Sequence, residues 1–449
     1  MIRRTARRIA GTLRALRHAP GQRREPFRDP EHWAESRDRR VRRIVRHAAA
    51  TVPHYRELFA SLRIDPRELR SARDLAELPL LEKSAVRADP TRFVSVDPAG
   101  QRSLSFVTSG STGEPLEVRH DHDSLLANIA FGERERSVIQ AVCGTRYREL
   151  WVNYSRSTVL KMWAYYRDHT LFPAPAGRLT VDVATPLPEL LALMDDFRPH
   201  VLVAYGSFLE TLFRVVAARG LEIHRPEMAI YGADGMTPDG RRRIERDFGV
   251  PVFSRYNAIE AFKIGFQCPE RRGFHLHPDL CDVRIVDGEG REVPDGAAGE
   301  IVISNLVNRA TVLLNYRLGD AGTRAVDPCA CGRTFPLLAE LEGRVEDVLD
   351  LADGRLVHPR SVWDVFKTRP KVLRYQLVQL TPARFALDLA TLDAASFDEL
   401  RPGVARDLAA LLGDAEVEIR RSADVGLGER GKFRPVRGLP PSPGGGDAC

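Results

Sequence analysis

The stretch Thr108-Ser109-Gly110-Ser111-Thr112-Gly113-Glu114-Pro115 lies between two short β-like runs, residues 105–107 and 116–118. Its two glycines let the backbone turn tightly and point N–H groups into one concavity, and its four hydroxyls add further donors. This donor set suits a polyphosphate. The loop is not a Walker loop, because the terminal Gly-Lys-Ser/Thr is missing. A polar hairpin turn explains the stretch equally well when it is taken alone.

Outward from this loop, short apolar runs alternate with amphipathic segments. Strands are expected at residues 104–107, 150–152, 201–204, 228–231 and 252–253, and helices at 187–197, 209–219 and 239–248. Such alternation predicts an α/β fold with a parallel sheet covered by helices on both faces. Before it, the chain is expected to be helical, with one helix over residues 39–49 and another ending at Leu62.

The pattern of apolar and polar residues changes twice more toward the C-terminus. Residues 282–326, with strands expected at 282–287, 299–304 and 312–316, predict an antiparallel or barrel-like sheet. After Gly343-Arg344 an independent α+β unit follows, with strands at 373–380 and 384–389 and a helix at 396–412. We therefore expect a basic helical extension (1–45), a large nucleotide-binding domain (46–346), a small mobile C-terminal domain (347–438) and a disordered tail (439–449).

Composition restricts the class of protein. Of 449 residues, 43% are hydrophobic and 29% charged, as in ordinary globular proteins, and no apolar run approaches the roughly 20 residues that cross a membrane. The net charge is +6, but residues 1–24 hold eight arginines and no acid. The rest is close to neutral, so nucleic acid is not an expected partner. For the basic segment we favour a solvated extension or docking helix, with weak contact to an acidic membrane surface as the alternative.

Six cysteines do not make a disulfide scaffold, and residues 1–24 do not read as a secretion signal because arginines interrupt the apolar part. The expected location is therefore the cytoplasm. Since a disulfide scaffold is not expected, the pairing in sequence of three cysteines and one histidine needs another explanation. Cys268 and His275 share one loop, and Cys329 and Cys331 share another. Together they supply the sulfur and nitrogen ligands of a tetrahedral zinc site, although unrelated buried thiols fit the spacing as well.

Four further segments contain candidate functional residues. Tyr256-Asn257-Ala258-Ile259-Glu260 places a carboxylate just past a strand end, where α/β sheets bind ligands, so Glu260 is a candidate Mg²⁺ ligand. An ordinary acidic residue opening a helix is the alternative. In Asn315-Tyr316-Arg317-Leu318-Gly319-Asp320 the final carboxylate suits a ribose diol, or is a plain turn residue. The other two segments are residues 343–347, at the domain boundary, and residues 431–434, where Lys432 is one of only six lysines in an arginine-rich chain.

These segments, in this order, resemble the adenylate-forming superfamily of acyl-CoA synthetases, adenylation domains and luciferases. The likeness is greatest to the phenylacetate–CoA ligase branch and its capsular-polysaccharide relatives. It spans about residues 52–437 and includes "VPHYRELF", "LPLLEKSAVR", "TSGSTGEP", "YNAIE", "GEIVISNL", "NYRLGD", "CACGR", "GRVED" and "GKFRPVR". Each motif is moderately specific, and their joint order is highly specific.

The resemblance implies a role for each matched position. Residues Thr108, Ser109, Gly110, Ser111, Thr112 and Gly113 would hold the ATP phosphates, and Gly232, Ala233 and Asp234 would line the adenine pocket with Tyr256 and Asn257 nearby. Glu260 would ligate Mg²⁺, Asp320 would bind the ribose, and Arg344 would support the sugar or phosphates. Asp347 would be the hinge of the small domain, and Lys432 would reach the carboxylate and α-phosphate. Members that carry a structural metal at the cysteine loops favour zinc here.

Three positions depart from the family pattern. Leu116-Glu117 stands where a lysine usually closes the phosphate loop, Ala233-Asp234 replaces the usual Gly-Glu, and Asn257-Ala258-Ile259 precedes Glu260 where small residues are expected. The last two bear on the identity of the substrate more than on ATP binding.

The expected reaction is ATP-dependent activation of a carboxylic acid to an acyl-adenylate, followed by transfer to coenzyme A or another thiol or carrier. Two alternatives stay open: adenylyl or acyl transfer to a hydroxyl or amine in polysaccharide or natural-product assembly, and a homologue that binds its ligand without turnover. Trp163, Tyr165 and Tyr166 could line a pocket for an aryl acid, but such clusters are more often core. The sequence does not name the acid, and it is compatible with a monomer or a homodimer.

Overall fold

The computed structural model describes residues 2–97, 103–108, 116–153, 157–172, 177–183, 185–342, 349–353, 356–357, 362, 365–366, 368–369, 371–422 and 435–439. The chain divides into two compact units. The first contains residues 1–182, 199–202 and 253–342, and the second contains residues 183–198, 203–252 and 343–449. The predicted boundary at 346/347 lies outside the described residues.

The first unit begins as a run of helices, in agreement with the sequence. Its helices are α1 (Ile2–Arg17), α2 (Pro30–Thr51), α3 (Pro53–Leu62), α4 (Lys83–Ala88), α6 (His122–Phe131), α7 (Glu133–Cys143) and α8 (Thr158–His169). Asp29 caps α2, and Pro53 occupies the first turn of α3, where its missing N–H costs no hydrogen bond. The expected break between α2 and α3 is therefore confirmed.

The segment predicted as a basic extension contains two different kinds of helix. The apolar face of α2, including Val41, Ile44 and Val45, is buried in a core shared with α3 and with Val312 and Leu314. Helix α2 is thus part of the packed body of the first unit. Helix α1 packs along α6 and α8.

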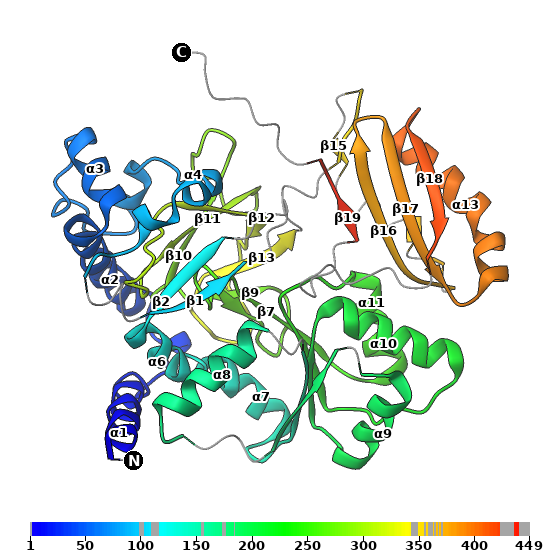
Figure 1. Cartoon of the computed structure of the whole chain (residues 1–449), viewed down its shortest axis with the longest axis horizontal. Helices are drawn as coiled ribbons and strands as arrows, with labels where there is room; N and C mark the ends of the chain where they lie inside the picture. The colour runs from blue at the N-terminus through cyan, green and yellow to red at the C-terminus, as the bar shows by residue number, and fades with distance from the viewer. Residues whose placement is uncertain are drawn as a thin grey trace. The chain divides into compact units, whose positions relative to one another are not determined.

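An antiparallel series of strands forms the centre of the first unit (Figure 1). In spatial order the strands are β10 (Cys281–Val286), β11 (Ala298–Asn305), β12 (Tyr316–Arg324), β13 (Leu337–Glu342), β9 (Phe274–Leu276), β8 (Gly265–Phe266) and β7 (Val252–Tyr256). Every neighbouring pair is antiparallel. The antiparallel character predicted for residues 282–326 is confirmed.

Two smaller pairings complete the first unit. Strands β3 (Glu149–Asn153) and β4 (Arg178–Asp182) are parallel, as strand–helix alternation requires. Strands β1 (Ser103–Val107) and β2 (Glu117–Asp121) form an antiparallel hairpin. This hairpin flanks residues 109–115, which lie outside the described part of the chain.

The strand expected at residues 312–316 is wrong in position. Strand β12 begins only at Tyr316, because Asn315 adopts a left-handed conformation with φ of 54° and turns the chain. Val312, Leu313 and Leu314 are buried, but as an irregular segment whose N–H groups bond to Phe93 and Tyr55. The apolar run at residues 312–314 correctly indicates that these side chains are buried. Burial alone, however, does not distinguish a β-strand from an irregular segment in the core.

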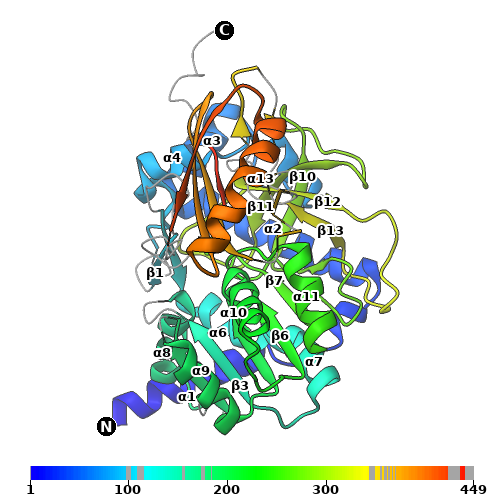
Figure 2. The ribbon, with the colours of Figure 1, turned by 90° about the vertical axis from the view of Figure 1, so that its right-hand side faces the viewer.

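The second unit combines an α/β layer with the C-terminal segment (Figure 2). Its first part holds α9 (Leu187–Phe197), β5 (Val201–Ala204), α10 (Gly206–Arg219), β6 (Met228–Tyr231) and α11 (Pro238–Phe248), and the chain re-enters the unit within β5. Helices α10 and α11 lie side by side. These elements match the expected helices and strands within three residues.

The C-terminal segment has a hydrophobic core of its own. Its four-stranded sheet has the order β18 (Glu416–Arg421), β17 (Arg384–Thr391), β16 (Val372–Thr381) and β19 (Val436–Arg437), accompanied by α13 (Ala394–Leu412) and the short pair β14 (Leu349–Asp350) and β15 (Leu356–Val357). Leu377, Leu387 and Leu408 are fully buried in that core. An α+β unit was expected here, and the described residues form one.

Candidate active site

The hairpin that carries the predicted phosphate loop is closed at its base by Thr108. The backbone N–H of Thr108 donates to the Leu116 carbonyl at 2.8 Å, and the Leu116 N–H donates to the Thr108 hydroxyl at 3.0 Å. Thr108 is buried. Its side chain therefore holds the two ends of the loop together. Ser109, Gly110, Ser111, Thr112 and Gly113 lie outside the described residues.

His120 on β2 ties this hairpin to the loop that contains Glu260. Its Nε2 lies 2.7 Å from the carbonyl oxygen of Ile259, and its ring stacks on Phe262 at 3.8 Å between centroids. Phe106 of β1 meets the same Phe262 ring edge-on at 5.2 Å. Burial lowers the pKa of His120 to about 4, so the imidazole is neutral near pH 7. The hairpin that flanks the predicted phosphate loop and the loop that contains Glu260 are thus packed against each other.

Glu260 is held from its backbone and from its side chain. Its side chain is buried, with 4% of the residue exposed, and one carboxylate oxygen lies 3.4 Å from the Tyr316 hydroxyl. The Asn305 amide donates to the Glu260 carbonyl at 2.8 Å. None of the ion pairs formed by the described residues includes Glu260. A buried carboxylate without a cationic partner is costly, and a hard divalent cation is one group that offsets this cost.

Lys263 fixes the far end of the same loop. Its Nζ lies 2.6 Å from the Glu135 carboxylate on α7, and Arg255 lies 3.2 Å from the other oxygen of that carboxylate. All three side chains are at least four-fifths buried. The loop after β7 is therefore anchored on both sides of Glu260.

Tyr256 and Asp320 meet directly. The Tyr256 hydroxyl donates to an Asp320 carboxylate oxygen at 2.9 Å, which joins the end of β7 to β12. Tyr316, which contacts Glu260, lies on the same strand as Asp320. The structure therefore brings Tyr256, Glu260 and Asp320 together, as the sequence predicted from segments more than 50 residues apart. The Asn257 residue next to Tyr256 is exposed.

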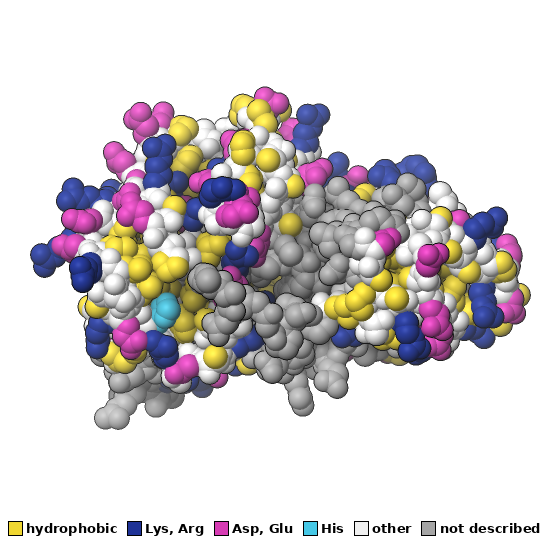
Figure 3. Space-filling model, turned by 90° about the horizontal axis from the view of Figure 1, so that it is seen from above, with side chains coloured by type: hydrophobic (Ala, Val, Ile, Leu, Met, Phe, Trp, Pro, Cys, Tyr) yellow, Lys and Arg dark blue, Asp and Glu magenta, His cyan; other side chains and the backbone are white. Residues whose placement is uncertain are grey.

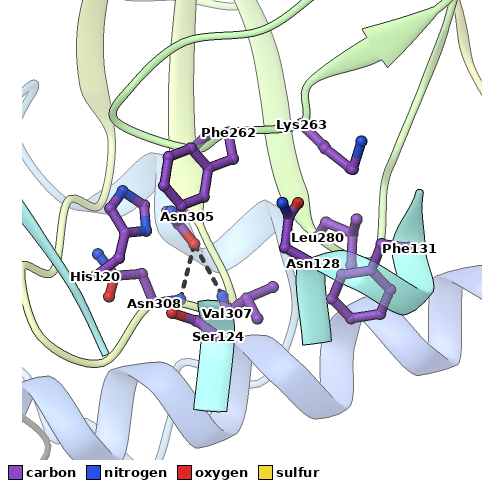
Figure 4. A pocket seen from close by; sticks show the side chains of 11 residues that line it. His120, Ser124, Asn128, Phe131, Phe262, Lys263, Leu280, Asn305, Val307 and Asn308 are labelled. Atoms are coloured by element: carbon purple, nitrogen blue, oxygen red, sulfur yellow. Dashed lines mark hydrogen bonds between the residues drawn. The ribbon is translucent and has the colours of Figure 1, made fainter. Parts of the chain in front are cut away.

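A small pocket, partly open to solvent, adjoins the loop that contains Glu260 (Figure 4). Its polar wall contains Asn305 and Asn308, and Figure 4 shows the Asn305 oxygen accepting from the N–H groups of Val307 and Asn308. The Asn308 amide in turn donates to the carbonyls of Arg119 and Thr311. These amides are engaged in holding the turn after β11 against the hairpin and the Glu260 loop. The pocket marks the junction of the three segments.

In the second unit, Gly232, Ala233 and Asp234 follow β6. An Asp234 carboxylate oxygen accepts from the Gly206 N–H at the start of α10, with 2.5 Å between the two atoms. Ala233 has a φ of 72°, in the left-handed region that favours glycine. The position where the family usually has glycine is thus one where glycine is the less strained residue.

The four predicted zinc ligands converge. Cys268, His275, Cys329 and Cys331 offer ligand atoms that all lie within 4.8 Å of one another. The sulfurs of Cys268 and Cys329 are 3.6 Å apart, and Cys331 Sγ lies 3.3 Å from His275 Nε2. In a tetrahedral zinc site, sulfurs are separated by about 3.8 Å and sulfur–nitrogen pairs by about 3.5 Å, from the usual bond lengths. The residues present fit such an ion.

The aromatic residues of α8 form a packed cluster. Trp163 packs on Trp151 at 4.8 Å, and the guanidinium of Arg178 lies 4.3 Å from the Trp163 ring centre. Tyr166 is hydrogen bonded to Asn128, and Tyr165 stacks on His169. None of the three residues predicted as candidates for an aryl pocket lines the pocket of Figure 4. All three are half-buried, and the aryl-pocket hypothesis stays a prediction.

Three further predicted site residues, Arg344, Asp347 and Lys432, lie outside the described residues. Other residues that hold the site were not singled out from the sequence: His120, Asn305, Tyr316 and the Lys263–Glu135 pair. Tyr316 and Asn305 stand inside the motifs "NYRLGD" and "GEIVISNL", so a signal for them existed. His120 and Glu135 carried none, because their contacts are to residues more than 100 positions away.

A family model and individual relatives were found for this chain. The model of the AMP-binding enzyme family matches residues 34–308. The phenylacetate-coenzyme A ligase of Thermus thermophilus is 27% identical over 350 residues, covering 76% of this chain and 77% of that protein. That of Escherichia coli is 25% identical over 356 residues, covering 75% and 77%.

Among solved structures, 2-hydroxyisobutyryl-CoA ligase in its postadenylation state superposes with a TM-score of 0.72 at 17% identity. The match covers 94% of this chain and 91% of that one, and at this identity it shows the fold. The family match spans well over half of the chain and contains both the hairpin and the Glu260 loop. The chain belongs to the AMP-binding enzyme family.

Proposed function

We propose that this protein activates a carboxylic acid with ATP to form an acyl-adenylate and then transfers the acyl group to coenzyme A. The observation that carries the proposal is the joint placement of Tyr256, Glu260 and Asp320 in a family member. Relatives named phenylacetate-coenzyme A ligase support coenzyme A as the acceptor.

The nucleotide is bound from two sides. Asp320, which accepts from the Tyr256 hydroxyl, binds the ribose hydroxyls through its carboxylate, which has several acceptor positions. Residues 108–113 bind the β- and γ-phosphates through backbone N–H groups and hydroxyls. Gly232, Ala233 and Asp234 contribute to the adenine pocket, and Arg344 to the sugar or phosphates.

Glu260 is the proposed ligand of Mg²⁺. When bound, the ion neutralises charge on the phosphates of ATP. The chain's own contribution is to keep this carboxylate fixed, through the Asn305 amide on its backbone and the Tyr316 hydroxyl beside its side chain. A fixed carboxylate needs little reorganisation at the moment of reaction.

The chemistry proceeds in two displacements. The substrate carboxylate attacks the α-phosphorus of ATP, and the bond to pyrophosphate breaks, which leaves acyl-adenylate. The thiolate of coenzyme A then attacks the acyl carbon and expels AMP. Lys432 binds the carboxylate and the α-phosphate during the first step only, because the small domain turns about Asp347 between the two steps.

The acid is proposed to be of the aryl-acetic class or a near relative, on the strength of the named relatives alone. The half-buried aromatic residues of α8, which contact Trp151 and Asn128, remain candidates for lining the acid pocket. The departures at Ala233-Asp234 and at residues 257–259 are consistent with a different acid within the carboxylate class.

A structural zinc ion is proposed at Cys268, His275, Cys329 and Cys331, because four ligand atoms of the right type lie at nearly tetrahedral separations. The ion would join β9 and the β8–β9 connection to the loop between β12 and β13. It has no role in the displacement steps. Its purpose is to hold loops that have few apolar side chains of their own.

The test is a panel of carboxylic acids assayed for pyrophosphate release, with and without coenzyme A. We expect acid-dependent pyrophosphate release and a thioester product when coenzyme A is present. Glu260→Gln keeps the shape of the side chain and should lower the rate by roughly a hundredfold. A stable adenylylated product formed without consumption of coenzyme A would move the protein to the adenylyl-transfer class.

A further inference from the structure

Helix α1 (Ile2–Arg17) is amphipathic, but it faces the protein with its small residues. Gly11 and Ala15 are buried against α6 and α8, and a side chain at Gly11 would overlap the carbonyl oxygen of His169. Ile9, Leu13 and Leu16, at helical spacing, point outward and are 45%, 63% and 47% exposed. A helix that served only to cover the body would bury these three residues instead.

The contacts on the inner side of α1 fix this orientation. Arg8 Nε donates to the Thr170 carbonyl at 2.7 Å, and the Leu171 N–H donates to the Thr12 hydroxyl at 2.8 Å. Both groups belong to the C-terminal end of α8, where backbone carbonyls lack helical partners and attract cations. Helix α1 is therefore docked specifically, and the outward direction of its large apolar side chains follows from that docking.

The exposed apolar residues of α1 lie at helical spacing on one side of the helix. Leu171, 46% exposed, lies next to this helix, because its backbone N–H donates to the Thr12 hydroxyl. Ile9, Leu13, Leu16 and Leu171 are four of the large hydrophobic residues exposed in the described part of the chain, and a concentration of such residues marks an interaction site.

The arginines around these exposed apolar residues indicate that the partner is anionic. Residues 1–24 contain eight arginines and no acid; Arg4, Arg14 and Arg23 pair with Asp168, Asp123 and Glu133, and Arg17, next to Leu16 at the end of the apolar stripe, is exposed. Elsewhere the surface is mixed, and the face in Figure 3 carries cationic and anionic side chains side by side. An in-plane helix with a leucine-rich face and arginine flanks is the pattern that binds anionic lipid, with the apolar side chains in the acyl region and the guanidinium groups at the phosphates.

We propose that α1 and Leu171 form a binding surface for anionic phospholipid bilayers, which retains this enzyme at a membrane without crossing it. No described helix is long and apolar enough to span a bilayer, and in-plane binding requires none. Lipid is favoured over an acidic protein partner because a bilayer surface uses both parts of the pattern at once, the apolar stripe and the excess of arginine over acid in residues 1–24. The proposal does not depend on which acid is activated.

The test is flotation of the full-length protein with vesicles of phosphatidylcholine, with and without phosphatidylglycerol. Binding to the anionic vesicles alone, weakened by salt, is expected. Leu13→Ser combined with Leu16→Ser should weaken binding at least about tenfold. Arg17→Ala should weaken it roughly fivefold. Leu62→Ser, which changes an equally exposed leucine on α3, should leave it unchanged.

The controls separate lipid binding from misfolding and from self-association. Adenylation activity in vesicle-free buffer should be the same for every variant, since none touches the candidate active site. Wild-type protein that fails to float with anionic vesicles overturns the proposal, as does equal flotation of the double serine variant. A loss of oligomeric mass in the double variant, measured by light scattering, assigns this surface to a second copy of the chain and also overturns the proposal.

Discussion

At the scale of single residues, Asp320 accepts a hydrogen bond from Tyr256, and we propose that its carboxylate also binds the ribose of ATP. The Tyr256 hydroxyl orients it across the gap between β7 and β12. A hydrogen bond to a charged group contributes about 1.5–3 kcal/mol, and a bond to ribose from a fixed carboxylate belongs to that class.

Asp320→Asn is therefore expected to raise KM for ATP by roughly 10- to 100-fold with a smaller effect on kcat. Pyrophosphate exchange at varied ATP measures both. Asp295→Asn, at an exposed carboxylate of the same unit, should change neither. If KM for ATP were unaltered in Asp320→Asn while kcat collapsed, the assignment to ribose would be wrong.

Ala233 gives a second prediction at this scale. An alanine at φ of 72° carries about 1–2 kcal/mol of strain that glycine avoids, so Ala233→Gly should raise the free energy of unfolding by up to about 1 kcal/mol. The same change at Ala60, an exposed helical position on α3, should lower it by about 1 kcal/mol. Urea unfolding of both variants checks the sign, and equal losses would contradict the strain argument.

At the scale of elements, His120 joins the β1–β2 hairpin to the Glu260 loop and does so as a neutral ring. Burial holds its pKa at about 4 in the folded state, against an ordinary value near 6.5. The unfolded chain thus binds a proton first as the pH falls. The stability due to neutral His120 is present above pH 6.5 and is lost as the pH falls toward 4.

We expect this single group to remove about 2 kcal/mol from the free energy of unfolding between pH 7 and pH 5. His120→Gln retains a donor for the Ile259 carbonyl but does not titrate. Its unfolding free energy should therefore depend less on pH by that amount, whatever its absolute stability. Parallel pH profiles for the two proteins would show that His120 is not buried as described.

The cysteine and histidine loops supply the second prediction at this scale. Metal analysis should find about one zinc ion per chain, from the count of four ligands. Removal of the ion by a chelator should lower Tm by several degrees, because binding energy at such a site is folding energy. Cys331→Ser should lose the ion, whereas Cys143→Ser, outside the cluster, should retain it. Fully folded protein with no bound metal would end the proposal.

At the scale of the whole molecule, the proposed reaction requires two arrangements of the same chain, one for each displacement. The described C-terminal residues carry a core of their own, which is what a segment needs in order to move as a body. The proposed hinge, Asp347, and the proposed catalytic lysine, Lys432, stand at opposite ends of that segment in the sequence.

Lys432→Ala is expected to reduce carboxylate-dependent pyrophosphate exchange by roughly 10²- to 10³-fold. Thioester formation from a supplied acyl-adenylate should stay largely intact, because that step takes place with Lys432 withdrawn. Lys371→Ala, at an exposed lysine of the same segment that pairs with Glu399, is the matched control. Equal loss in both half-reactions would show that Lys432 has another role.

Local pattern was enough to predict most of the elements and their order. Periodicity located the helices α9, α10 and α11 and the strands β5, β6, β16 and β17, because amphipathic faces and buried runs are local properties. It failed at residues 312–316, where burial and turn geometry compete within five residues and Asn315 decides the outcome.

The candidate site divides in the same way. Motif order indicated Tyr256, Glu260 and Asp320, and the cysteine pairs indicated the metal cluster, because residue type and spacing are visible in one dimension. The contacts of His120 with Ile259, of Lys263 with Glu135 and of Tyr316 with Glu260 were decided only by tertiary structure. So was the outward direction of Leu13 on α1. The physical reason is that a sequence specifies which face of a helix or strand is apolar, whereas the partner of that face depends on how distant segments pack.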